Sequence, residues 1–216
     1  MAATIEVRLE NRFSRTRLAM FSQDRKELKE QREAFIDARR FELMRADPTR
    51  VNPKYGHLLP EALFPKDLIC TCGHKMYDYV DAPLGPIVSA AFRDCVEAIE
   101  PGVHRFLPVE IFKTDKTPHE QSPFFYFDIR NFLDAIDPST GAVETIGRDS
   151  FDNPHRTWSI VSNRHSDLAV KKERVDGKAA WIDLRLPRTF FSDALIEQLE
   201  AVGLEGHRLQ DKFAEI

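Results

Sequence analysis

The residues Phe124-Phe125-Tyr126-Phe127-Asp128-Ile129 form the most aromatic stretch of the chain. Aromatic side chains favour strands and bury large areas, so we predict a buried strand over 124–129. Residues 103–112 alternate along their length and predict a second strand. The polar residues 113–123 between them predict a hairpin loop. The rest of the fold is predicted outward from this antiparallel pair.

A helix is predicted on each side of the pair. Residues 87–99 carry an apolar stripe at helical spacing, with Ser89 as a capping residue and Glu100-Pro101-Gly102 as the stop. The second helix begins after Ser192 and ends at Gly203. Both helices are amphipathic, so each is expected to cover one face of the sheet.

Shorter apolar segments complete the predicted sheet. Asp176-Gly177 predicts a turn between the segments 168–170 and 180–184. Residues 207–209 are predicted to form a last strand or a docked tail. Helices and strands neither alternate strictly nor segregate fully, so the predicted fold class is α+β, mainly an antiparallel sheet with flanking helices. The further strands are predicted at 4–9, 157–161, 168–170 and 180–184.

The N-terminal part differs in composition from the rest. Residues 22–44 predict a charged helix with a thin apolar stripe that includes Leu28 and Phe35, and we expect this stripe to dock on the core. Residues 47–67 carry four prolines and predict an irregular connection. We therefore predict an N-terminal arm, helix and Pro-rich connection over 1–79 and an α+β domain over 80–216.

Composition excludes several classes of protein. The chain has 216 residues, 42% hydrophobic and 31% charged, with a net charge of −4. Residues 1–50 carry a net charge of +3 and the remainder −7, the opposite of the basic main domain that a nucleic-acid binder would show. No apolar run is long enough to span a membrane, and residues 1–6 do not begin a signal peptide. With three cysteines, an odd number, reduced thiols in a cytoplasm are expected.

One cluster suggests a metal. Cys70, Cys72 and His74 are zinc-ligand types, but a single residue separates each from the next, and Cys95 and His104 could complete a site only through the fold. The alternative is a pair of small thiols in a turn, which we favour, so no metal or cofactor is predicted. A zinc-stabilised interaction module stays open as a hypothesis.

A second cluster suggests catalysis. Asp128, Asp134 and Asp137 could form a general acid–base pair or a divalent-ion site, which would make the protein a metal-dependent hydrolase or nuclease. The alternative is a strand-end aspartate, a cap and an Asp-Pro turn, and we favour it. No nucleophile elbow, phosphate loop or His-Glu-x-x-His motif is present in the sequence. We therefore predict that the protein is not an enzyme.

The remaining histidines and the two tryptophans are predicted from their neighbours. His119, His155 and His165 lie in loop contexts and are expected to face solvent. Trp158 leads into a strand and is expected to be half-buried, whereas Trp181 is expected in the core.

The succession of motifs over about 80–216 resembles family eleven of the immunity proteins of bacterial polymorphic toxin systems. Its most specific parts are Pro-Gly-x-x-x-Phe-x-Pro-Val at 101–109 and Asp-Ala-Ile-Asp at 134–137. The other stretches that carry the resemblance are Gly85–Ser89 with Phe92, Cys95 and Val96, then Phe125–Ile129, Asn131, Trp181, Arg185 and Phe191–Gly206.

The resemblance implies a non-enzymatic cytoplasmic protein that binds and neutralises a cognate toxin protein. A toxin that attacks nucleic acid would carry a basic active-site cleft, and an acidic inhibitor surface would be steered to that cleft. Loops on a rigid sheet are common recognition sites, so we predict that loop 113–123 and turn 137–153 contact the partner. The acidic residues of that turn are the predicted partner-binding set: Asp137, Glu144, Asp149 and Asp152.

Overall fold

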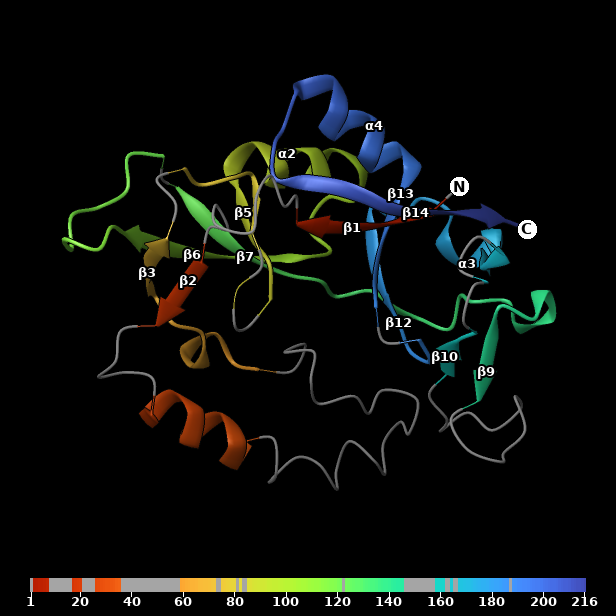
Figure 1. Ribbon diagram of the computed structural model, residues 1–216, viewed down its shortest axis with the longest axis horizontal. Coiled ribbons are helices and arrows are strands. Elements are labelled where there is room, and N and C mark those ends of the chain that lie inside the picture. The colour runs from red at the N-terminus through yellow and green to blue at the C-terminus, as the bar shows by residue number, and fades with distance from the viewer. Residues whose placement is uncertain are drawn as a thin grey trace.

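The structure of the protein is a computed structural model with two six-stranded sheets and a small two-stranded one (Figure 1). Of the strand pairs in its described part, three are parallel and the others antiparallel, and helices flank the sheets. The predicted α+β class is therefore confirmed. The structure describes residues 2–7, 17–20, 26–35, 59–72, 75–80, 82, 85–121, 123–145, 158–161, 164, 167–186 and 188–216.

The first large sheet joins the two ends of the chain. Strand β1 lies between β13 and β14 and pairs antiparallel with both, so the predicted strand at 4–9 is found two residues earlier. The segment predicted at 207–209 is a full strand of this sheet. In sheet order the strands are Ala169–Val170 (β11), His207–Glu215 (β14), Ala2–Val7 (β1), Thr189–Ser192 (β13), Ala180–Asp183 (β12) and Phe132–Leu133 (β8).

The second large sheet is built on the predicted hairpin. Strands β6 and β7 pair antiparallel with Leu107 opposite Tyr126, and the polar residues 113–123 connect them as expected. In sheet order the strands are Arg17–Met20 (β2), Asp67–Cys72 (β3), Arg105–Phe112 (β6), Phe124–Asp128 (β7), Ile87–Ser89 (β5) and Tyr79–Val80 (β4).

The prediction of a helix over 87–99 is wrong at its start. Residues Ile87–Ser89 form β5, which pairs with β7, and the helix α2 covers only Ala90–Ile99. Ile87 and Val88 are β-branched and fully buried, which suits a central strand. The Ser89 hydroxyl accepts the Phe92 N–H at 3.2 Å and caps the helix, so the capping residue marks the true boundary.

The other helices are short or amphipathic. Helix α4 (Asp193–Val202) has the predicted Ser192 cap, and Gly203 ends it in a left-handed conformation at φ +72°. Two helical elements were not predicted: the helix Lys172–Val175 (α3), before the Asp176-Gly177 turn, and the 3-10 turn Glu61–Leu63 (η2). The Asp-Pro turn is the 3-10 helix Pro138–Thr140 (η3), and the small sheet pairs Val143–Thr145 (β9) with Trp158–Ile160 (β10).

Three apolar cores hold these layers together. In the first, α2 and α4 pack on both large sheets, and Phe92 of α2 contacts Phe127 of β7 with ring centroids 5.8 Å apart. The second lies on the opposite face of β7, around Tyr126. The third contains Trp181 stacked on Phe190. Alternate residues of β7 thus serve different cores, which explains its aromatic sequence.

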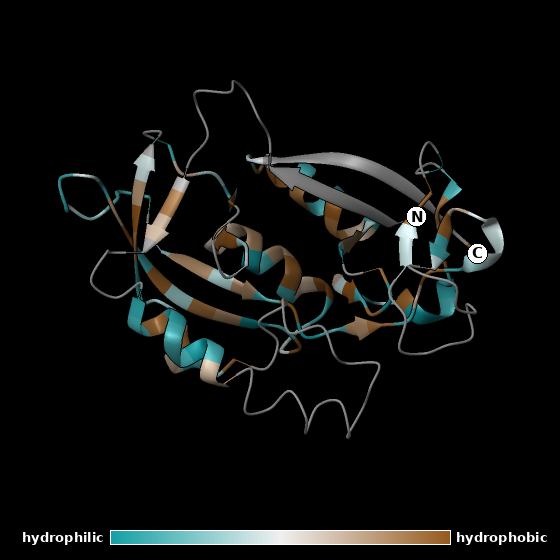
Figure 2. Cartoon of the chain, turned by 60° about the horizontal axis from the view of Figure 1, so that its bottom comes forward, coloured by the Kyte–Doolittle hydropathy of each residue, from teal (hydrophilic) through white to brown (hydrophobic). Residues whose placement is uncertain are grey.

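A charged helix covers the second core. Of the predicted segment 22–44, residues 26–35 are described and helical, and the others lie outside the described residues. Leu28, Arg32 and Phe35 are half-buried, and Phe35 packs against the core around Tyr126. Most of this helix is hydrophilic (Figure 2). Through Phe35 the helix packs against this core, which agrees with the predicted docking of its apolar stripe.

Candidate functional site

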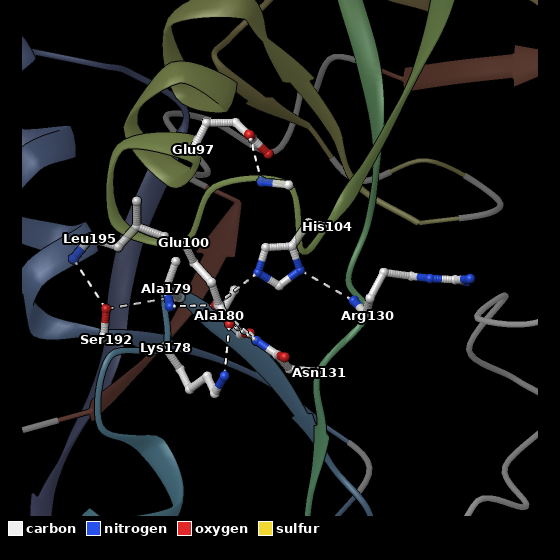
Figure 3. A network of polar contacts seen from close by, with 11 residues as sticks. Glu97, Glu100, His104, Arg130, Asn131, Lys178, Ala179, Ala180, Ser192 and Leu195 are labelled. Atoms are coloured by element: carbon white, nitrogen blue, oxygen red, sulfur yellow. Dashed lines mark hydrogen bonds and ion pairs between the residues drawn. The ribbon is translucent and has the colours of Figure 1, made fainter.

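A polar network in the interior surrounds the carboxylate of Glu100, which is 5% exposed (Figure 3). Glu100 directly follows α2, and the other members come from the residue before β6, from the chain between β7 and β8 and from the two residues before β12. Its oxygens accept Asn131 Nδ2 at 2.8 and 2.9 Å, Lys178 Nζ at 3.0 Å and the N–H of Ala179 at 3.0 Å. His104 Nε2 lies 3.2 Å away. We call Glu100, His104, Asn131, Lys178 and Ala179 the Glu100 centre.

The hydrogen bonds fix the protonation of His104. Its Nδ1 accepts the backbone N–H of Arg130 at 3.2 Å, so Nδ1 carries no proton. The hydrogen therefore lies on Nε2 and is donated to Glu100, which leaves the ring neutral. Protonation of Nδ1 would place two donors against each other and break the bond to Arg130.

The pKa values agree with this geometry. Burial lowers the pKa of His104 below its ordinary value, against the Glu100 carboxylate that favours the charged ring. Burial alone would raise the pKa of Glu100, but the donors from Ala179, Asn131 and Lys178 outweigh it and hold that pKa below its usual range. The centre is thus one carboxylate and one ammonium with a neutral imidazole. Each charge is compensated inside the fold.

A second buried carboxylate belongs to Asp183, which is 1% exposed. Each of its oxygens accepts two backbone N–H groups at 2.8–3.1 Å, those of Ala135 and Ile136 on one side and of Arg185 and Leu186 on the other. Burial raises the pKa of Asp183 to about 6, against these four donors that lower it. This Asp183 centre ties the end of β12 to the chain after β8.

The three candidate catalytic aspartates are used separately. Asp128 forms ion pairs with Arg105 and Arg130, at 2.8 and 3.2 Å. Asp134 accepts Arg185 at 3.0 Å, and that guanidinium also lies 4.9 Å from the Trp158 ring.

Asp137 caps η3 by accepting the N–H and the hydroxyl of Ser139. Among the described residues, no three histidine, cysteine or carboxylate side chains converge as metal ligands. The structure therefore gives the hydrolase hypothesis no site.

The cysteines and histidines likewise stay apart where they are described. Cys70 and Cys95 are buried and in no disulfide, and burial raises the pKa of the Cys95 thiol, as do nearby carboxylates. The side chain of Cys72, and His74, His155 and His165, lie outside the described part of the chain. The prediction that His119 faces solvent is wrong. This residue is 4% exposed, because its loop folds back and its backbone N–H donates to the carbonyl oxygen of Ile111.

Trp158 is also more buried than predicted, at 4% exposed, because Arg185 and the third core enclose it. Trp181 is fully buried, as predicted. Both tryptophans therefore belong to the structural core.

The structure describes two of the four predicted partner-binding residues, Asp137 and Glu144. Glu144 is exposed on β9, and its carboxylate accepts the Ser159 hydroxyl at 3.3 Å. Asp137 is occupied by its capping bonds. Asp149 and Asp152 lie outside the described residues.

A more extended acidic surface lies at the other end of the molecule. A groove of about 580 Å³ runs between residues 61–67 and residues 107–110 of β6. A second depression of about 380 Å³, beside helix 26–35, shares the lining residues 64–67. We call the first the acidic groove, defined by the charged rim residues Glu61, Lys66, Asp67 and Glu110 and the wall prolines Pro65, Pro108 and Pro123.

Neither the Glu100 centre nor the acidic groove is predicted from the sequence. Glu100 is predicted only as part of a helix stop, although a carboxylate before Pro-Gly and four residues from a histidine is a possible signal of a side-chain network. Glu110 is the polar residue of an alternating strand, which signals exposure but not a groove. The groove itself depends on where β3 joins β6, and no local pattern encodes that.

The fold and the two polar centres define an α+β protein in which the buried ionic groups hold segments of the chain together. Residues 15–212 match the sequence model of the immunity protein family Imm11. The chain therefore belongs to this immunity protein family. The match begins well before residue 80, where the resemblance in the sequence begins, and it includes the charged helix and the Pro-rich connection.

Two further findings accompany this membership. A comparison with curated proteins gave no match. Within the described residues, no helix combines the length and the apolar character that crossing a bilayer requires.

Proposed function

We propose that this protein protects the cell that makes it by binding a toxin protein directly and covering the toxin's active site. The observation that carries the proposal is the family match over residues 15–212. In this proposal the protein works in the cytoplasm, binds one toxin molecule and carries out no catalysis.

The use of charge in the interior supports a binding role. The carboxylates of Glu100, Asp128 and Asp183 each accept several hydrogen bonds within the fold. A group that must take up or release a proton during catalysis needs room for a substrate beside it. The interior carboxylates are instead surrounded by protein donors, so the exterior is the part that would act.

Net charge supports a basic partner. Residues 51–216 carry a net charge of −7, and an acidic surface raises the rate at which it meets a basic cleft. The acidic residues of the 137–152 segment stay a prediction for part of this contact. Among them Glu144 is the one whose exposed carboxylate the structure describes.

The test is a titration of the toxin encoded in the neighbouring reading frame. Purified protein is added to active toxin, and residual toxin activity is measured together with the intact mass of both chains. We expect inhibition to be complete at one protein per toxin, with both masses unchanged. Inhibition at a small fraction of one equivalent, or a changed toxin mass, would show catalytic inactivation and contradict the proposal.

An Asp134→Asn variant serves as the control for the hydrolase hypothesis. The substitution keeps the size of the side chain but removes the carboxylate that pairs with Arg185. Binding by occlusion predicts unchanged inhibition by the folded variant. Lost inhibition with retained toxin binding would support catalysis instead.

A further inference from the structure

The acidic groove opens where the pairing of two strands ends. β3 and β6 are parallel, with Asp67 opposite Glu110, and the N–H of Glu110 donates to Lys66 O at 2.8 Å. Continuing this register two residues back would place Pro65 opposite Pro108, and the next donor from β6 towards β3 would be the N–H of residue 108. Proline has no N–H, so this bond cannot form and the pairing ends before Pro108. The groove lies beside this end, with Pro65 and Pro108 in its lining.

The prolines also make the groove rigid. Pro65 and Pro108 have fixed φ angles, and Pro123 stands on the far wall. The buried side chains of Leu107 and Phe124 back the wall from the core side. A surface that is already in its binding shape loses little conformational entropy when a partner docks.

Within the described residues, the acidic side chains on the rim of the groove have no ion-pair partner. Glu61, Asp67 and Glu110 are exposed, and none of them forms an ion pair with another described residue. Lys66 is the cation among the described lining residues, so the rim has a net charge of −2. Elsewhere on the surface, carboxylates such as Glu205 and Glu120 are paired with Lys75 and Lys113.

We propose that the acidic groove is the docking site for the toxin, and that it receives a segment with two or more Lys or Arg side chains around an apolar residue. This inference rests on the proposed function. The apolar wall would exclude water from the centre of the contact, and the three carboxylates would pair with the basic side chains at its edge. A rigid wall and an uncompensated rim are what such a segment requires.

The test compares two double charge reversals of equal size. Glu61→Lys with Glu110→Lys changes the groove, and Glu173→Lys with Glu200→Lys changes exposed positions on α3 and α4. The probe is the toxin domain encoded in the neighbouring reading frame, made inactive, with its association and dissociation rates measured at low and high ionic strength. We expect the groove variant to lose about tenfold or more in affinity, mostly in association rate, with a weaker salt dependence. The control should stay within about twofold of the wild type.

Three outcomes would overturn the proposal. Equal losses in the two variants would reduce the effect to net charge. An unchanged groove variant beside a weakened Glu144→Lys variant would move the contact to the 137–152 segment. A groove variant that changes the oligomeric state of the protein but not its toxin affinity would make the groove a contact between two copies of this chain.

A photo-crosslinking residue at position 108 gives an independent readout. It should attach to the toxin, whereas the same residue at position 173, on the control surface, should not. Failure of the wild type to bind the toxin at all would instead reject the proposed function, so the two failures can be told apart.

Discussion

The Glu100 centre and the acidic groove use the same chemical group in opposite ways. Glu100 is buried and accepts donors from three other segments, whereas Glu61, Asp67 and Glu110 are exposed without an ion-pair partner among the described residues. A buried carboxylate without partners would destabilise the fold, but an exposed one costs little. Carboxylates with partners inside the fold therefore stabilise this protein, whereas the exposed carboxylates of the groove are available to another molecule. The experiments below test this division.

The largest effect is expected at the Glu100 centre. Glu100→Ala leaves Lys178 and the Ala179 N–H without their acceptor, and breaking a buried ion pair in this way costs about 3–5 kcal/mol. The measurement is the free energy of unfolding in urea. Glu97→Ala is the matched control, because Glu97 lies on the same helix and accepts one exposed N–H, from Gly102. It should cost about 1 kcal/mol. Equal losses would remove the distinction between the two carboxylates.

A smaller loss is expected at Asp183. Asp183→Asn keeps the shape of the side chain but replaces one oxygen with an NH₂ group that faces two backbone donors. Unsatisfied buried donors cost about 1–3 kcal/mol, so the variant should unfold at lower urea concentration. Hydrogen exchange at the amides of Ala135 and Leu186 should accelerate as well. Unchanged protection of both amides would contradict the assigned network.

His104 predicts that the stability of the protein depends on pH through the Glu100 centre. Its pKa is lowered in the folded protein by burial, so below its ordinary pKa of about 6.5 the unfolded chain binds more protons than the folded one. Stability should therefore fall as the pH falls through that value towards the folded pKa. Subtracting the pH profile of His104→Gln from that of the wild type isolates this contribution from that of Asp183. A difference that stays flat, or that rises on acidification, would refute the neutral ring.

The smallest effect on stability is expected in the groove. Glu61→Gln and Glu110→Gln remove exposed charges with no partner among the described residues, so each should change the free energy of unfolding by less than about 0.5 kcal/mol. Thermal melts at low salt provide the measurement. A loss comparable to that of Glu100→Ala would mean that the groove carboxylates support the fold, and the division between the two regions would fail.

Local chemistry made several elements predictable. The aromatic run at 124–129 could only be a buried strand, and Ser192 with Gly203 marked both ends of α4. The start of α2 was misjudged because Ile87 and Val88 fit a helical stripe and a strand equally well. Their pairing with β7 decides between the two, and pairing partners are distant in sequence.

The polar centres were beyond sequence reasoning for the same reason. Glu100 and Lys178 are 78 residues apart, and Asp183 binds amides 47 and 48 residues away. Residue context correctly predicted separate roles for Asp128, Asp134 and Asp137, but it placed Cys70 in a turn, whereas Cys70 lies in the strand β3. The sequence could not show that Pro65 and Pro108 line one groove, because that depends on the register of β3 against β6.

The position of β1 has a consequence for how the protein is made. This strand, from the first seven residues, is sandwiched between β13 and β14, which come from the last thirty. Its neighbours emerge from the ribosome only after the residues between β1 and β13 have been translated. The sheet must then close across this long intervening stretch, and contacts of such high sequence separation form slowly. We expect the hairpin β6–β7 and α2 to fold while translation continues, and the sheet around β1 to assemble last.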